Sequence, residues 1–356
     1  MFKFALSACI CALLSMGPLP AANAAGAGAG ASQYGETAKK AQIRKRSKIA
    51  ASKVKRTRAY RGRASITLNA KRKGAFDRAA RRARAFAPAV MTMGDLAGLN
   101  LTRDPLDLKS SVAFVLDENS SEVLFEKNAN VALPIASITK LMTGLIVVEA
   151  GQDMDEVLTI TEEDVDRERF STSRLRVGTR MTRSDLLHIA LMSSENRAAS
   201  ALGRNFPGGL RAFVNEMNAK ARSLGMHDTH YVDSSGLSSR NVASARDLAK
   251  LVKAAHQQPI LREYSTAEKA VVTAGRSRLQ FGTTNYLVTR PEWEIGIQKT
   301  GFINEAGRCL VMQAMVAGRN VVMVFLDSKG KQSRTGDANR MRKWLEAMRS
   351  GATPVS

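Results

Sequence analysis

The chain is poor in cysteine and in acidic residues. It has 3 cysteines in 356 residues, and both Cys9 and Cys11 lie close to the N-terminus. If an N-terminal segment that contains both is removed from the mature chain, Cys309 is the one cysteine left, which excludes an intramolecular disulfide. The 32 acidic residues are outnumbered by 54 lysines and arginines. A body without disulfides must rely on its own apolar core, and the chain is long enough to form one.

The N-terminus lacks an apolar run that could span a bilayer as a stable helix. The stretch ALSACICALLSM is too short for that, but it has the length of a signal-peptide core. Lys3 precedes it, and the small residues of AANA follow it. These features predict a signal peptide over residues 1–24, cleaved after about Ala24, and therefore an exported, soluble chain.

The basic excess lies mostly in one segment. Residues 39–84 contain 19 lysines and arginines against one acid, Asp77, which gives +18 of the total +22. Because this stretch has few large apolar residues, we expect residues 25–107 to form a disordered basic arm. The arm is either a solvated linker or a tether to an anion. Export argues against nucleic acid and favours a phosphorylated lipid, lipopolysaccharide or acidic wall polymer.

Beyond the arm, short apolar runs lie at both ends of the body and helical patterns lie between them. A strand hairpin is expected over residues 111–130, followed by a helix that ends before Gly151. Residues 159–290 are predicted to be mostly helical, with Ser184 and Ser244 as N-caps. Three more strands and a closing helix are expected over 293–301, 308–318, 320–328 and 337–348. This order predicts an α+β fold, with one sheet assembled from both ends and an inserted helical lobe.

The closing helix is amphipathic. Its apolar stripe consists of Met341, Trp344, Leu345 and Met348. We expect this stripe to pack in the core rather than to face a membrane or a ligand.

The stretch PIASITKLMTGLIVV has Ser137 and Lys140 at the head of an apolar helix. A spacing of three puts both side chains on one helix face, one turn apart. A buried ammonium is costly, so its pKa is lowered or it is paired, and an easily neutralised amine can activate a hydroxyl nucleophile. The helix N-terminus adds N–H groups that suit an oxyanion. Ser-x-x-Lys also occurs at 52–55 and 328–331, so the motif needs partners.

Two partner motifs follow in the order that this chemistry needs. Ser194-Glu195-Asn196 comes directly after an apolar helix, and Lys299-Thr300-Gly301 occurs once, at the end of the strand WEIGIQ. The ordered set Ser-x-x-Lys, Ser-x-Asn and Lys-Thr-Gly is the signature of penicillin-binding proteins and serine β-lactamases. Stretches such as LMSSENRAAS and IQKTGFINEAGRCLVM extend the resemblance to the low-molecular-mass penicillin-binding proteins, and more narrowly to the D-alanyl-D-alanine endopeptidases. It covers about residues 108–348, within a predicted catalytic domain of residues 108–350.

The resemblance implies a β-lactamase/transpeptidase-like fold, an antiparallel sheet flanked by helices with an all-helical lobe, and a site in the groove between them. The implied catalytic residues are Ser137, Lys140 and Ser194. The implied substrate-binding residues are Asn196, Lys299, Thr300, Gly301 and Phe302. No metal or cofactor is implied. The implied location is the periplasm, with peptidoglycan stem peptides as substrate and β-lactam antibiotics as covalent inhibitors.

Each implied residue has a role in this picture. Ser137 would attack the carbonyl of the penultimate D-alanine, and Lys140 would take the proton. Ser194 would help to pass that proton to the leaving amine. Asn196 would hold a substrate amide, Lys299 would set the positive potential, and Thr300 would bind the carboxylate beside the scissile bond. The N–H groups of Ser137 and Phe302 would form the oxyanion hole, with Arg334 assisting at the carboxylate.

Other functions fit the residues less well. A class A β-lactamase adds a deacylating glutamate, and the helical region has no stretch that resembles its glutamate loop. A metallopeptidase would need more than His227 and His230, because HExxH is absent. A wall-binding protein without activity would not need intact motifs. A D-alanyl-D-alanine carboxypeptidase is the open alternative; many of these continue into a second β-rich domain and a membrane-binding helix that we do not expect here.

Overall fold

The computed structural model describes residues 91–275 and 277–350. The predicted signal peptide and residues 25–90 of the predicted arm lie outside these ranges. Within them, no helix is both long enough and apolar enough to cross a lipid bilayer.

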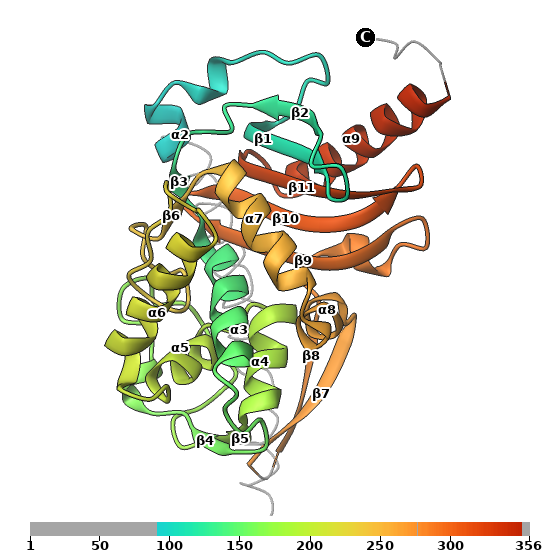
Figure 1. The fold of residues 1–356 in the computed structure, drawn as a ribbon. Coiled ribbons are helices and arrows are strands. Elements are labelled where there is room, and N and C mark those ends of the chain that lie inside the picture. The colour runs from blue at the N-terminus through green and yellow to red at the C-terminus, as the bar shows by residue number, and fades with distance from the viewer. Residues whose placement is uncertain (1–90, 276, 351–356) are drawn as a thin grey trace, which may run out of the picture. The chain divides into compact units, whose positions relative to one another are not determined.

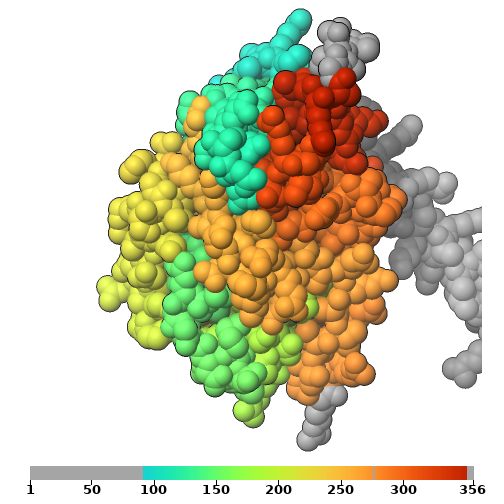
Figure 2. Space-filling model, turned by 45° about the vertical axis from the view of Figure 1, so that its right-hand side comes forward, coloured from blue at the N-terminus to red at the C-terminus, as the bar shows by residue number. Residues whose placement is uncertain are grey.

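A five-stranded antiparallel sheet is the central element (Figure 1). Its strands lie in the order β2, β1, β11, β10 and β9. Their bounds are Ser110–Asp117 (β1), Val123–Lys127 (β2), Glu294–Ile303 (β9), Gly307–Val316 (β10) and Arg319–Ser328 (β11). Because β1 pairs with β11, the first and last parts of the body lie side by side, as Figure 2 also shows. The prediction of one sheet assembled from both ends is confirmed.

Both faces of the sheet are buried. Successive residues of a strand point to opposite faces, so Val324 of β11 joins the core under the helical lobe, whereas its neighbour Met323 joins a second core. Helix α9 (Ser333–Arg349) covers that second core on the far side of the sheet (Figure 1). Met341 and Leu345 of the predicted apolar stripe are buried there, but Met348 is 55% exposed.

The helical lobe is inserted between β2 and β9. Its helices are α3 (Thr139–Glu149), α4 (Arg183–Met192), α5 (Asn196–Arg204), α6 (Gly209–Ser223), α7 (Ala245–His256) and α8 (Pro259–Thr266), with short 3-10 turns η2 (Ala136–Ile138), η3 (Glu162–Asp164) and η4 (Tyr286–Thr289). Helix α3 is buried along most of its length, and α7 lies against the sheet (Figure 1). Gly151 has φ +61° just after α3, as expected for a glycine that ends a helix.

Two details of this lobe differ from the sequence prediction. Ser244 caps α7, but Thr182 rather than Ser184 caps α4, because the Thr182 hydroxyl accepts from the backbone N–H of Asp185 at 3.1 Å. The mostly helical region also contains three small two-stranded sheets. They pair β3 (Leu133–Pro134) with β6 (Val242–Ala243), β4 (Val157–Thr159) with β5 (Arg180–Thr182), and β7 (Lys269–Ala274) with β8 (Ser277–Gly282).

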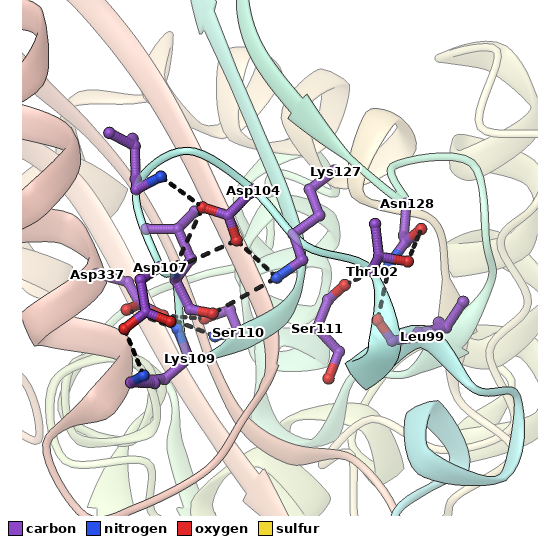
Figure 3. Close-up of polar contacts among 12 residues, drawn as sticks. Leu99, Thr102, Asp104, Asp107, Lys109, Ser110, Ser111, Lys127, Asn128 and Asp337 are labelled. Atoms are coloured by element: carbon purple, nitrogen blue, oxygen red, sulfur yellow. Dashed lines mark hydrogen bonds and ion pairs between the residues drawn. The ribbon is translucent and has the colours of Figure 1, made fainter. Parts of the chain in front are cut away.

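Packed structure begins before residue 108, where the arm was predicted to end. Residues 91–107 include α2 (Met93–Leu96) and η1 (Leu99–Leu101). Asp104 accepts from Lys127 Nζ at 2.8 Å, and both side chains are 5% exposed (Figure 3). Asn128 donates to the carbonyls of Leu99 and Ser111. These polar contacts anchor the segment, and Leu99 and Leu106 pack against the two apolar cores, so the folded body begins earlier than the predicted end of the arm.

Candidate active site

The first motif lies where η2 leads into α3. Ser137 is in the 3-10 turn, and Lys140 is in the first turn of the α-helix. Lys140 Nζ donates to Ser137 Oγ at 2.9 Å. The contact that a spacing of three predicts is therefore present, although the α-helix itself starts only at Thr139.

Lys140 is fully buried and has three oxygen partners. Besides Ser137, its Nζ donates to Asn196 Oδ1 at 2.8 Å and to the Ser235 carbonyl at 2.5 Å. Burial lowers the pKa of Lys140 from 10.5 to about 8, and the carboxylates of Asp233 and Glu195 oppose that shift. The amine can therefore lose its proton near neutral pH, as a general base requires.

The second motif is a tight connection between two helices. Helix α4 ends at Met192 and α5 begins at Asn196, and Ser194 between them has φ +63°. That φ is uncommon for a residue with a side chain and is typical of functional sites. Lys299 Nζ donates to Ser194 Oγ at 3.0 Å. The second and third motifs are thus in direct contact, although about a hundred residues separate them in the sequence.

Lys299 is the second buried amine of the site. It comes from β9, and its Nζ also donates to the Thr300 carbonyl at 2.9 Å. Burial lowers the pKa of Lys299 well below 10.5, and the positive charges of Lys140 and Arg334 lower it further. The site therefore holds two buried amines, each with a lowered pKa.

Strand β9 passes close to the serine turn. A Cβ on Gly301 would lie 2.8 Å from the Ile135 carbonyl and 3.2 Å from the Ser137 nitrogen, so only glycine fits without movement. Because β9 is at the edge of the five-stranded sheet, it pairs with β10 on one side and with no other strand of that sheet. Phe302, the next residue, is half-exposed at this edge. The backbone N–H groups predicted to form an oxyanion hole come from these two adjoining segments.

Sequence reasoning missed the loop that supplies the third partner of Lys140. The Asp233 carboxylate accepts from Ser235 N at 2.6 Å and Gly236 N at 2.5 Å, and also from Ser238 N at 2.9 Å. Gly236 has φ +79° and lies against the Ala136 carbonyl. The sequence VDSSGL indicated a turn, but nothing local indicated that its Ser235 carbonyl reaches a lysine 95 residues earlier.

Supporting side chains surround the three motifs. Ser171 accepts from Asn196 Nδ2 at 3.0 Å, and Thr284 lies 2.6 Å from Thr300 between hydroxyl oxygens. Glu195, which had no assigned role, caps α5 and accepts from Ser173 at 2.6 Å. These contacts fix the amide of the second motif and the hydroxyl of the third.

Arg334, expected to assist at the substrate carboxylate, contacts the backbone instead. Its Nη1 donates to the carbonyls of Gly301 at 2.9 Å and Cys309 at 3.3 Å. Burial lowers the pKa of Arg334 to about 10. These contacts join β9 to β10 beneath the site, while the arginine adds positive charge behind Lys299.

The fold and this constellation define a class of protein. A serine hydroxyl bound to a buried lysine, beside a second serine–lysine pair on a sheet edge, is the arrangement of serine-active peptidases of the penicillin-binding type. Residues 100–330 match the D-alanyl-D-alanine carboxypeptidase family, peptidase S11, and the chain belongs to that family.

Known proteins match over most of the body. The D-alanyl-D-alanine endopeptidase of Pseudomonas aeruginosa is 45% identical over 73% of this chain and 84% of its own length. That of Escherichia coli is 40% identical over 70% and 81%. Five matching proteins named D-alanyl-D-alanine carboxypeptidase are 27–29% identical. The cefotaxime-bound penicillin-binding protein D2 of Listeria monocytogenes has a TM-score of 0.61 and 28% identity over 68% of this chain and 99% of its own.

Proposed function

We propose that this protein is a DD-endopeptidase that hydrolyses peptidoglycan cross-links between D-alanine and the diamino acid of a neighbouring stem. The observation that carries the proposal is the contact between Ser137 Oγ and a buried Lys140 whose pKa is about 8. Two relatives at 40% identity or more have the endopeptidase name, and the matches named carboxypeptidase are more distant. A carboxypeptidase is the second candidate, since its substrate bond also joins two D-centres beside a free carboxylate.

The chemistry follows from the contacts. Ser137 Oγ forms a bond to the D-alanine carbonyl carbon while its proton moves to Lys140. The N–H groups of Ser137 and Phe302 stabilise the oxyanion, a contribution of a few kcal/mol in comparable sites. As the tetrahedral intermediate collapses, the C–N bond breaks and Ser194, held by Lys299, helps to deliver a proton to the leaving amine. Water then hydrolyses the acyl-enzyme and restores the serine.

Substrate binding uses the free edge of the sheet. An extended peptide can add to the unpaired side of β9, since main-chain hydrogen bonds are available at an edge strand. Asn196 Nδ2 and the Thr300 hydroxyl would bind a substrate amide and the carboxylate next to the scissile bond, and Lys299 and Arg334 would supply the positive potential. Gly301 allows this strand to approach the nucleophile.

The decisive assay is a digest of purified cross-linked muropeptide dimers mixed with monomeric pentapeptides, read by mass spectrometry. We expect dimers to become monomers while pentapeptides persist. Pentapeptides that lose one alanine while dimers persist would identify a carboxypeptidase. Ser137→Ala should lose cleavage and covalent penicillin labelling together, with an unchanged circular dichroism spectrum. Labelling of Ser137→Ala would refute the assignment of the nucleophile.

The proposal also includes export of the chain and a role for its basic arm. Residues 1–24 would direct the chain to the periplasm, so N-terminal sequencing of the mature protein should begin near Ala25. The +18 of residues 39–84 supports binding to an anionic envelope polymer or lipid. A full-length variant with these lysines and arginines changed to glutamine should lose salt-sensitive co-sedimentation with purified sacculi or lipopolysaccharide vesicles. Equal sedimentation of both proteins would leave the arm as a linker.

A further inference from the structure

A short loop beside the site is fixed by one carboxylate. Asp166 accepts from the backbone N–H groups of Glu168 and Arg169, both at 2.9 Å, and of Ser171 at 2.7 Å. These hydrogen bonds favour the charged form and lower the pKa of Asp166, although burial acts in the opposite direction. The loop of residues 166–171, called here the Asp166 loop, is therefore a defined structure rather than a loose connection.

The Asp166 loop connects both sides of the site. Arg169 Nε donates to the Leu237 carbonyl, in the loop that holds Ser235, and Arg169 Nη1 lies 3.0 Å from Glu305 Oε2, just beyond β9. On the other side, Ser171 accepts from Asn196 at 3.0 Å. The residues before and after position 170 are thus both bound to segments that form the site.

Phe170 is held between these anchors in an unfavourable state. Its side chain is 81% exposed, more than any other large apolar side chain among the described residues. Its φ of +53° is an outlier for a bulky residue, a strained conformation that its surroundings must hold in place. Neither feature stabilises the free protein. A strained backbone angle in a segment that its surroundings hold in place is typical of active sites and ligand contacts.

We propose that Phe170 is a specificity-determining residue that contacts the methylene chain of the diamino acid on the leaving side of the cross-link. This inference rests on the proposed endopeptidase function. Beyond the shared D-centre and carboxylate, the leaving group of a cross-link has an aliphatic chain, whereas a terminal D-alanine has only a methyl group. An aromatic face that covers the longer chain therefore favours the cross-link over the terminal residue.

The test compares three substrates on Phe170→Ala. With dimers, KM should rise roughly ten-fold, equivalent to about 1.4 kcal/mol, while kcat changes little. Pentapeptide trimming and the rate of penicillin acylation should stay close to those of the wild type, because neither ligand has the long chain on its leaving side. Leu101→Ala is the matched control, since Leu101 is 77% exposed on η1 and has no contact with the site motifs.

A second variant, Phe170→Gly, distinguishes a lost substrate contact from a folding defect. Glycine adopts φ +53° without strain, so this variant should be at least as thermostable as the wild type and should show the same KM defect. Unchanged dimer kinetics in both variants would overturn the inference. An equal loss of penicillin acylation would also overturn it, because the loop would then act only by positioning Asn196. If the wild type itself trims pentapeptides and spares dimers, the proposed function fails first, and this inference fails with it.

Discussion

Acylation of Ser137 should accelerate as pH rises and should level off above about pH 9. Only the neutral form of Lys140 can accept the serine proton. With a pKa of about 8, roughly 10% of Lys140 is neutral at pH 7 and roughly 90% at pH 9. The second-order rate constant for acylation by a fluorescent penicillin should therefore rise about nine-fold over that interval. The measurement is this rate constant from pH 6 to 10 at constant ionic strength.

Lys140→Arg separates the base from its charge. Arginine keeps the positive charge but does not release its proton in this range, so acylation should fall by roughly 10²- to 10⁴-fold and the inflection near pH 8 should disappear. Lys343→Arg, an exposed change on α9, is the matched control. A rate that is flat from pH 6 to 9 in the wild type would refute the assignment. If the inflection survives in Lys140→Arg, the titrating group would be Lys299 instead of Lys140.

A change at Glu195 tests whether nearby carboxylates raise the pKa of Lys140. The Glu195 carboxylate raises the pKa of Lys140, so Glu195→Gln should lower that pKa and move the inflection to lower pH. At pH 7 more of the lysine would then be neutral, and the glutamine can still accept at the start of α5. An inflection that moves to higher pH would contradict the stated cause.

Three further substitutions test the close approach of β9 to the nucleophile and the energetics of two buried carboxyl groups. Gly301→Ala should slow acylation without unfolding the protein, because the new Cβ would lie 3.2 Å from the Ser137 nitrogen; an unchanged rate would show that the strand can yield. Asp104→Asn should cost about 3–5 kcal/mol in urea unfolding, because it leaves the buried Lys127 ammonium without an opposite charge. Asp327→Asn should raise the thermal stability at pH 7, because burial raises the pKa of Asp327 and ionisation is unfavourable there. That gain should vanish below the ordinary pKa of 3.8, and a gain at low pH only would contradict it.

The sequence predicted those parts of the fold that depend on local patterns. Strands β1, β10 and β11 are largely apolar because both of their faces are buried, so they were visible as apolar runs, whereas β2 and β9 have fewer apolar residues and contain charged ones. The contact between Ser137 and Lys140 follows from helix geometry alone. The meeting of Ser194 with Lys299 does not, and it was inferred only because the three motifs occur in a known order.

Other features have no local signal. The Ser235 carbonyl and the Ser171 hydroxyl reach the motifs through tertiary packing, over separations of 95 and 25 residues. The hairpin of β7 and β8 has few buried residues, so its apolar pattern was too weak to separate from the helices around it. The cap of α4 was assigned to Ser184, two residues after Thr182, since residue type alone does not say which has extended backbone angles.

The stability cost of burying Lys140 explains why its amine has several hydrogen-bond partners. A lysine whose pKa falls from 10.5 to about 8 on folding costs about 3 kcal/mol of stability below pH 8, and the cost disappears as pH rises from 8 to 10.5. Domains are stable by only about 5–15 kcal/mol, so this is a large share. The Ser235 carbonyl and Asn196 Oδ1 limit the cost, because they solvate the ammonium that water cannot reach. Their positions depend in turn on the Asp233 carboxylate and on Ser171. The Asp233 carboxylate and the Ser171 hydroxyl thus help to keep this destabilising amine in place.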